Sequence, residues 1–275
     1  MPRLLSLALA ALLLAGCAAL SPGPETTPTP SAPPVDLPAP TLHTFEATST
    51  IGGTERAVEL PYLVYEPVDY DPDGGTRYPL LIMLHGAGLD SSRIADLDEL
   101  PSRPDPLRYR PYDFPFLYVF PFAPPDNTWV DIADVMGAFL DMLTEDYPVD
   151  PDRVYLAGYS MGGGGAWVLG ALYTDRLTAI AAIAGGWPAY LPLRPVPSVC
   201  DIGTTPVWAA HSRRDEVVGV FSSDHLVSRL QTCGGTVVFD RYEDENHSES
   251  IVRALNDPAL YEWLLAQASA QAETP

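Results

Sequence analysis

Short apolar runs alternate with longer amphipathic stretches along the chain from about residue 42 onward. Two early stretches, 42–48 and 56–67, are typical of a pair of strands, and the second alternates apolar with polar residues. The later runs are continuously apolar and bounded by turn-forming residues, as in strands buried on both faces of a sheet. These runs are "PLLIMLHG", "FLYVFPF", "RVYLAG", "LTAIAAIAGG", "PVWAAHS" and "VVFDRY".

Helical periodicity occupies the stretches between these runs. "DIADVMGAFLDMLTEDYP" places its apolar residues on one stripe, and "GGGGAWVLGALY", "VVGVFSSDHLVSRLQTC" and "PALYEWLLAQAS" complete the set. This alternation predicts right-handed βαβ units and an α/β fold, with helices flanking a mostly parallel central sheet and no large lid domain. In such a sheet, functional side chains gather at the carboxyl ends of the strands.

Residues 1–16 depart from this pattern and are predicted to be a lipoprotein signal peptide. Arg3 precedes an apolar run, 4–15, which is too short for a comfortable membrane span. The run ends in "LAGC", which resembles the bacterial lipobox, where cleavage before the cysteine leaves its thiol to carry a lipid. Cys17 is therefore the predicted lipidation site. An ordinary signal peptide with an incidental cysteine is the alternative.

Residues 17–40 are predicted to be a disordered linker that follows the lipidated cysteine, and residues 41–275 the folded domain. Proline dominates the linker, and such a segment cannot bury enough surface to offset the entropy lost on ordering. We expect it to hold the folded domain away from a membrane. The protein would then lie in the cell envelope, lipid-anchored outside the cytoplasm, or be secreted.

Charge narrows the choice of partners. The chain has 36 acidic residues against 15 arginines and no lysine, which gives a formal net charge of −21. Such a surface repels nucleic-acid phosphates and anionic lipids. We therefore expect no nucleic-acid partner, and contact with a membrane only through the N-terminal lipid. The sequence predicts a monomer without a metal or other cofactor.

Two further cysteines, Cys200 and Cys233, remain for a disulfide in an exported protein. Each precedes a strand-like run, "TPVWAAHS" or "TVVFDRY". If these runs are neighbouring parallel strands, both cysteines lie at the same edge of the sheet, within bridging distance. We predict a Cys200–Cys233 disulfide, with two buried free thiols as the alternative.

The chemistry centres on "YLAGYSMGGGGAW", in which Gly158, Ser160 and Gly162 form a G-x-S-x-G motif. A strand precedes the motif and a helix follows it, so the serine lies on a sharp turn that exposes its hydroxyl above the sheet. The backbones at Gly158 and Gly162 pass too close to leave room for a Cβ. Gly163 would let the helix approach the sheet, whereas the two glycines after it have no explanation in the sequence.

A serine hydroxyl becomes a nucleophile only when a base removes its proton, and the base must be a histidine. His247 follows "TVVFDRY" in the loop "EDENHSES", at the carboxyl end of the last predicted strand, and is the predicted base. His43 and His225 are assigned to the surface or to packing. His211, which ends a strand, is assigned to the core or to a supporting position.

Asp215 follows the run "PVWAAHS" and is predicted to orient the protonated base. Asp240 and Asp244 are nearer to His247 in sequence, but an acid from the end of a neighbouring strand has better geometry. A solvated turn acid is the alternative for Asp215. Ser160, Asp215 and His247 then follow the order nucleophile, acid, base.

"LIMLHGAG" ends an early strand in a turn whose backbone N–H groups, with that of Met161, can point at one carbonyl oxygen. An ordinary strand-to-loop turn is the alternative for this segment. Trp129 and Trp187 lie near strand ends and are predicted to line the substrate pocket, with simple packing as the alternative. Together with the serine motif, these features predict a serine hydrolase.

The stretches "YPLLIMLHGAG", "VDPDRVYLAGYSMGGGGAW", "HSRRDEVV" and "ENHSE" resemble the α/β-hydrolase superfamily, over about residue 42 to the C-terminus. They are most similar to small secreted carboxylesterases, including feruloyl-esterase-like and polyhydroxybutyrate-depolymerase-like enzymes. The resemblance implies an α/β-hydrolase fold with Ser160 as nucleophile, His247 as base, Asp215 as acid, and Ala87 and Met161 as oxyanion donors. One departure concerns the acid loop, where related sequences often have proline at the position of Gly219.

The sequence therefore predicts an extracytoplasmic carboxylic-ester hydrolase that forms an acyl-enzyme on Ser160 and acts on a small or polymeric ester. A serine peptidase of the prolyl-oligopeptidase type is one alternative, although about 235 residues leave no room for the second domain usual in that group. A non-catalytic, surface-binding lipoprotein is another, and the complete set of catalytic residues disfavours it. The acyl and alcohol groups of the substrate stay open.

Overall fold

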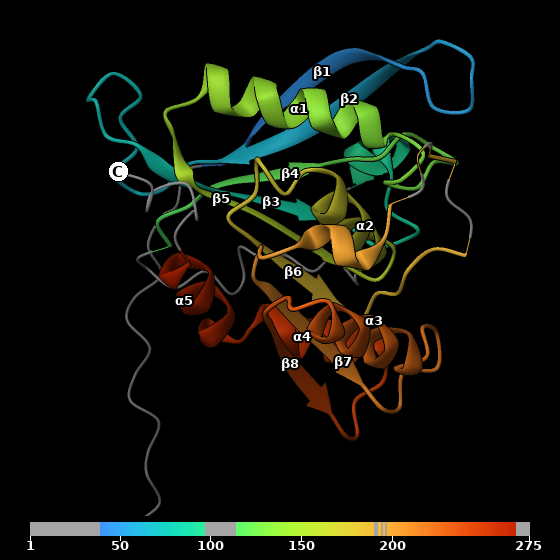
Figure 1. The fold of residues 1–275 in the computed structure, drawn as a ribbon. Coiled ribbons are helices and arrows are strands. Elements are labelled where there is room, and N and C mark those ends of the chain that lie inside the picture. The colour runs from blue at the N-terminus through green and yellow to red at the C-terminus, as the bar shows by residue number, and fades with distance from the viewer. Residues whose placement is uncertain (1–38, 97–113, 190–191, 194, 196, 268–275) are drawn as a thin grey trace, which may run out of the picture. The chain divides into compact units, whose positions relative to one another are not determined.

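An eight-stranded sheet forms the centre of this computed structural model, which describes residues 39–96, 114–189, 192–193, 195 and 197–267 (Figure 1). The strand order is β1-β2-β4-β3-β5-β6-β7-β8. β2 pairs antiparallel with β1 and with β4, and every later pair is parallel. The strands are β1 Thr41–Ser49, β2 Arg56–Tyr65, β3 Tyr78–Leu84, β4 Leu117–Pro121, β5 Val149–Tyr159, β6 Ala179–Ile183, β7 Val207–Ser212 and β8 Val237–Tyr242.

Helices cover both faces of the sheet and bury a separate apolar core on each. The first core contains the apolar faces of α1 Ala133–Asp146, α2 Met161–Leu172 and α3 Phe221–Thr232. The second contains those of α4 His247–Leu255 and α5 Pro258–Ala266. Alternate side chains of β3 enter opposite cores, which is why its sequence is continuously apolar. The predicted α/β architecture is confirmed.

Two helices differ from the sequence prediction. α3 begins at Phe221, so the preceding residues 217–220 belong to the turn that carries the predicted acid. α4 was not predicted, and placing His247 in a loop was wrong, because His247 is the first residue of this helix. The missed indication is a capping box: the Asn246 side chain accepts from the Glu249 N–H at 3.0 Å, and the Glu249 carboxylate accepts from the Asn246 N–H at 3.0 Å.

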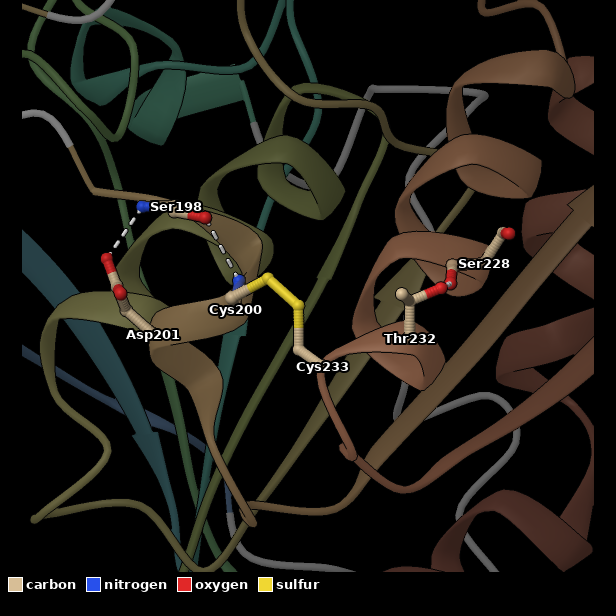
Figure 2. Close-up of a disulfide and its surroundings, with 6 residues drawn as sticks. All are labelled: Ser198, Cys200, Asp201, Ser228, Thr232 and Cys233. Atoms are coloured by element: carbon tan, nitrogen blue, oxygen red, sulfur yellow. Dashed lines mark hydrogen bonds between the residues drawn. A yellow bond between two sulfur atoms is a disulfide. The ribbon is translucent and has the colours of Figure 1, made fainter.

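The predicted disulfide joins Cys200, in the short 3₁₀ helix η2 Val199–Ile202, to Cys233 at the end of α3, with a Cα–Cα distance of 5.6 Å. Figure 2 shows that Ser198 caps η2, because its hydroxyl accepts from the Cys200 N–H while Asp201 accepts from the Ser198 N–H. The cross-link closes a separation of 33 residues, which corresponds to about 3–4 kcal/mol in the chain-entropy model.

The predicted signal peptide, Cys17 and most of the predicted linker lie outside the described residues, which begin at residue 39. Another 3₁₀ helix, η1 Ser91–Asp96, follows β3. Within the described ranges, every helix is too short or too polar to cross a bilayer.

Candidate active site

The turn between β5 and α2 holds Ser160 in a conformation that few residues other than glycine adopt. Its φ is 55° and its ψ is −119°, and only two other non-glycine residues of the described part have positive φ. Such a conformation costs about 1–3 kcal/mol and persists only where the surroundings impose it. The Ser160 N–H donates to the Ile183 carbonyl of β6 at 2.9 Å, which helps to fix the turn.

The glycines on either side of Ser160 permit this turn because three backbone segments meet there. A Cβ at Gly158 would lie 2.2 Å from the Gly162 carbonyl oxygen, and a Cβ at Gly162 would lie 2.0 Å from that of Leu84. Backbone atoms at these distances cannot rotate away, unlike the end of a side chain. Both positions therefore require glycine, which agrees with the close approach expected from the motif.

The remaining glycines of the run, Gly164 and Gly165 among them, are explained by contacts that the sequence could not reveal. A Cβ at Gly163 would lie 2.5 Å from the Ile183 carbonyl oxygen, and one at Gly164 would lie 2.7 Å from that of Gly186. A Cβ at Gly165 would lie 2.8 Å from the Cβ of Trp129. With Leu84 at the end of β3, the first turn of α2 is thus packed against three separate segments of the chain, the other two being 183–186 and Trp129.

The structure brings Ser160, His247 and Asp215 together in one hydrogen-bonded chain. His247 Nε2 lies 2.9 Å from Ser160 Oγ, and His247 Nδ1 lies 2.6 Å from Asp215 Oδ2. Because a carboxylate oxygen can only accept, Nδ1 carries the hydrogen and Nε2 is left free to accept the serine proton. Asp215 and His247 are buried. This is the tautomer that a general base requires.

The turn after β7 that carries Asp215, called the acid turn below, is held by hydrogen bonds from its own backbone. Asp215 Oδ1 accepts the N–H groups of Val217 at 2.9 Å and Val218 at 2.8 Å. At Gly219, a Cβ would lie 2.4 Å from Cε1 of Phe221, an exposed side chain. The two backbone bonds to Oδ1 therefore hold the turn.

The other acids and histidines considered from the sequence lie elsewhere. Asp244 forms an ion pair with Arg214 at 3.3 Å on the surface, and Asp240 belongs to β8. His43 stacks on Tyr62, and His225 is an exposed residue of α3.

His211 is buried and lies in a supporting position, as expected from the sequence. Its Nε2 lies 3.1 Å from Asp215 Oδ2, the same oxygen that accepts from His247.

His85 fixes the turn that follows β3. Its Nε2 accepts the N–H of Ala123 at 3.0 Å, so Nδ1 carries the hydrogen and donates to the Gly86 carbonyl at 2.8 Å. The His85 carbonyl accepts from Nε1 of Trp129 at 3.0 Å. Burial lowers the pKa of His85 to about 4, an effect that the bond to Gly86 partly offsets, and the ring is neutral near pH 7.

The predicted oxyanion donors lie on the two segments that border Ser160. A Cβ at Gly86 would lie 3.1 Å from the Ser160 Cβ, so the turn before Ala87 passes beside the serine. Met161 is the first residue of α2. In the described part of the chain, no hydrogen bond uses the N–H of Ala87 or of Met161. Both groups are available to a substrate oxygen.

A cavity of about 430 Å³ opens beside Ser160. Both predicted tryptophans line it: Trp129 is fully buried and forms part of its wall, whereas Trp187 is half-buried. No Arg, Lys or His occurs among the described residues that line the cavity, although Asp131 is one of them. In the same described ranges, no group of three or more His, Cys, Asp and Glu side chains could hold a metal ion.

Residues 117–257 match the family described as phospholipase/carboxylesterase. The chain belongs to this family. A crystal structure of a thermostable esterase is 26% identical, with a TM-score of 0.62, over 82% of this chain and 63% of that one. The family and the fold together identify a serine hydrolase of the carboxylesterase type. A search of curated proteins found no match.

Two ferulic acid esterases are more distant and bear on the fold alone. One is 18% identical with a TM-score of 0.58, covering 81% of this chain and 96% of its own. The other, a CE1 enzyme from Anaeromyces mucronatus in complex with ferulic acid, is 17% identical with a TM-score of 0.53, covering 81% and 92%. Both agree with the α/β-hydrolase fold over most of this chain.

Replacing His85 by Gln should weaken the pH dependence of stability. The folded pKa of about 4 lies below the ordinary value of histidine, so His85 stabilises the fold above about pH 6.5 and loses this effect as pH falls toward 4. The loss amounts to roughly 2–3 kcal/mol between about pH 7 and pH 4.5. In urea unfolding, the free energy of unfolding of His85→Gln should fall less than that of the wild type over this pH range, by that amount. His225→Gln, at an exposed position, should keep the wild-type dependence of the free energy of unfolding on pH. The same dependence in both variants would contradict the burial of a neutral His85 ring.

Gly165→Ala should destabilise the protein by about 1–3 kcal/mol. The new Cβ would overlap with the Cβ of Trp129, an atom that can move only if the backbone moves with it. Gly170→Ala is the matched control in the same helix. Its Cβ would meet side-chain atoms of Ile180 alone, chiefly Cδ1 at the flexible end and Cγ1 at 3.2 Å, and alanine favours the helix by about 0.5–1 kcal/mol. Thermal unfolding measures the difference between the midpoint temperatures of the two variants. Equal midpoints would refute the close packing of Trp129 against Gly165.

Proposed function

We propose that this protein is an extracytoplasmic carboxylic-ester hydrolase that works through an acyl-enzyme on Ser160. The observation that carries the proposal is the continuous chain from Ser160 Oγ through His247 to Asp215, with distances of 2.9 and 2.6 Å, at the edge of a cavity. The family and the similar thermostable esterase support ester cleavage.

In the first step, Ser160 Oγ attacks the ester carbonyl carbon while its proton passes to His247 Nε2. The negative charge that develops on the carbonyl oxygen is stabilised by the N–H groups of Ala87 and Met161. Asp215 remains ionised and stabilises the protonated His247. The tetrahedral intermediate then expels the alcohol, which takes the proton from His247, and the acyl group stays on Ser160.

In the second step, a water molecule replaces the alcohol. His247 Nε2 removes a proton from this water as its oxygen attacks the acyl carbon, and the same N–H groups stabilise the second oxyanion. The intermediate releases Ser160, which regains its proton from His247. The products are one carboxylic acid and one alcohol for each ester and water consumed, and the enzyme returns to its starting state.

The cavity favours a neutral substrate group of moderate size. Its volume of about 430 Å³ lies within the usual range for small-ligand sites. The apolar rings of Trp187 and Pro188 supply contact area, whereas Asp131 would repel a carboxylate carried by the substrate. Two similar structures are named ferulic acid esterases, which supports including aromatic acyl esters among the substrates assayed.

An extracytoplasmic location is supported by two independent features. The sequence before Cys17 resembles a lipobox, and the folded domain contains the Cys200–Cys233 disulfide, a bond that persists mainly outside the reducing cytoplasm. We propose that a lipid on Cys17 anchors the protein and that the proline-rich linker lets the domain reach substrates near the membrane surface.

Ser160→Ala should reduce hydrolysis of short p-nitrophenyl esters by at least about a thousandfold, because no other group can form the acyl-enzyme. A fluorophosphonate probe should label the wild-type protein on Ser160 and leave the variant unlabelled. Thermal unfolding of the variant should show that the fold is retained. Hydrolysis at the wild-type rate by a folded Ser160→Ala would overturn the proposal, and a wild-type protein that neither reacts nor hydrolyses would indicate a binding function.

Cys17→Ser should release the protein from the membrane fraction of a bacterium that processes lipoproteins, because its hydroxyl does not replace the thiol as the site of lipid transfer. Cell fractionation and labelling with a radioactive fatty acid would measure the change. Cys200→Ser is the control, since it removes a thiol without altering the lipobox and should leave the fatty-acid label in place. A wild-type protein without the label would refute the anchor.

A further inference from the structure

His211 is a buried histidine that contacts the acid of the catalytic chain. It lies in β7 with no exposed surface, and its Nε2 is 2.7 Å from the Val218 carbonyl oxygen and 3.1 Å from Asp215 Oδ2. A carbonyl oxygen only accepts, so Nε2 must carry a hydrogen. That hydrogen is bonded to the carbonyl, and the carboxylate oxygen is its second, longer contact. Asp215 is thus surrounded by His211, by His247 and by two backbone N–H groups.

The other ring nitrogen of His211 is controlled by Ser223. Nδ1 lies 2.7 Å from Ser223 Oγ, which in turn lies 3.0 Å from the Gly185 carbonyl oxygen. A hydroxyl has one hydrogen, so it can donate to only one of these two groups. If Ser223 donates to Nδ1, His211 is neutral. If Ser223 donates to Gly185, Nδ1 must carry a second hydrogen and His211 is a cation.

The surroundings favour the neutral ring. Burial lowers the pKa of His211, and the Val218 carbonyl and the charge of Asp215 offset part of this effect. His247 is a second histidine nearby, and it becomes positive during the reaction. Arg241, the register partner of His211 on β8, is ion-paired with Asp224 of α3 at 2.7 Å. Asp224 is therefore paired with Arg241, and the negative charge that faces His211 is that of Asp215. His247 depends on the same charge.

We propose that His211 is a positioning residue that sets how strongly Asp215 stabilises protonated His247, and that the Ser223 hydroxyl keeps it neutral. A neutral donor on Oδ2 fixes the direction of the carboxylate but leaves its full negative charge. A cationic His211 would neutralise that charge and repel the imidazolium of His247. The inference rests on the proposed ester hydrolysis for its kinetic part.

The same hydrogen bonds join the acid turn to the wall of the cavity. Val218 lines the cavity, and Gly185 precedes Gly186, which also lines it. Gly185 itself packs against the first turn of α2, since a Cβ there would lie 2.4 Å from the Gly163 carbonyl carbon. His211 and Ser223 therefore hold the acid turn and the segment after β6 in a fixed relation.

The test compares His211→Met with His211→Gln, and uses His225→Gln as the control on the same side of the sheet. Methionine fills the space without a donor, whereas glutamine can present an N–H near the position of Nε2. In His211→Met, the charge of Asp215 acts on His247 alone, so His247 is protonated at higher pH. The acid limb of the pH profile of kcat/KM, where activity falls as the pH is lowered, should shift upward by about half to one pH unit. The value of kcat should fall about tenfold.

The glutamine variant should recover most of the wild-type kcat and return the acid limb toward the wild-type pH, and the control should match the wild type throughout. A structural role alone would lower stability or kcat without moving the limb. An unshifted acid limb in a folded His211→Met would overturn the proposal.

Ser223→Ala is a milder variant that tests the proton arrangement. If the hydroxyl donates to Nδ1, its loss makes His211 easier to protonate, and the cation then opposes protonation of His247, so the acid limb moves to lower pH. If the hydroxyl instead accepts from a cationic His211, its loss favours the neutral ring and moves the limb to higher pH, and that result would overturn the neutral assignment.

The titration of the His247 ring, followed by NMR and assigned with His247→Gln, gives the same comparison without substrate. An unchanged His247 midpoint in both His211→Met and Ser223→Ala would refute the role of His211. If the wild-type protein hydrolyses no ester but the His247 midpoint shifts as expected in the two variants, the proposed function is refuted and the role of His211 is retained.

Discussion

The close approach of the first turn of α2 to the ends of β3 and β6 is the constraint on which the site depends. Glycines on α2 let its backbone contact the carbonyl groups of Leu84, Ile183 and Gly186. These contacts force Ser160 into its positive-φ conformation and bring the turn after β3 beside it. They also seat Trp129 and the segment after β6, which line the cavity. One packing arrangement therefore places the proposed nucleophile, the predicted oxyanion donors and two walls of the pocket.

The catalytic chain adds a second constraint, which is electrostatic. Asp215 is buried, its two oxygens accept three hydrogen bonds, two from the backbone and one from His247, and Oδ2 also lies 3.1 Å from Nε2 of His211. A buried carboxylate without such partners would take up a proton and lose its influence on His247. The donors keep the charge in place and direct it. This arrangement also explains why the acid comes from β7: its turn offers backbone N–H groups, whereas Asp240 lies within a strand and Asp244 faces Arg214 on the surface.

Much of the fold could be predicted because its causes are local. Strands buried on both faces are continuously apolar, and a sharp strand-to-helix turn leaves a G-x-S-x-G motif, so the sheet and the position of Ser160 follow from short stretches of sequence. α4 was missed because a nine-residue helix leaves only a brief periodic pattern, and its capping box of Asn246 and Glu249 was overlooked. Gly164 and Gly165 were not explained, and the contact between His211 and Asp215 was not identified, because their partners come from other segments of the chain. Tertiary contacts of this kind leave no periodic pattern in the sequence.

The conformation of Ser160 has a consequence for molecules that are not fully folded. In an open chain nothing holds a serine at positive φ, so it relaxes to an ordinary conformation as soon as α2 separates from β3 and β6. The strain is released by the same movement that separates Ser160, His247 and Asp215, the three proposed catalytic residues. A transiently opened molecule is therefore not a weaker enzyme but an inert one, and its reactivity returns only when the whole packing closes again. Reactivity toward a serine-directed probe would thus count intact molecules rather than measure an average over partly folded ones.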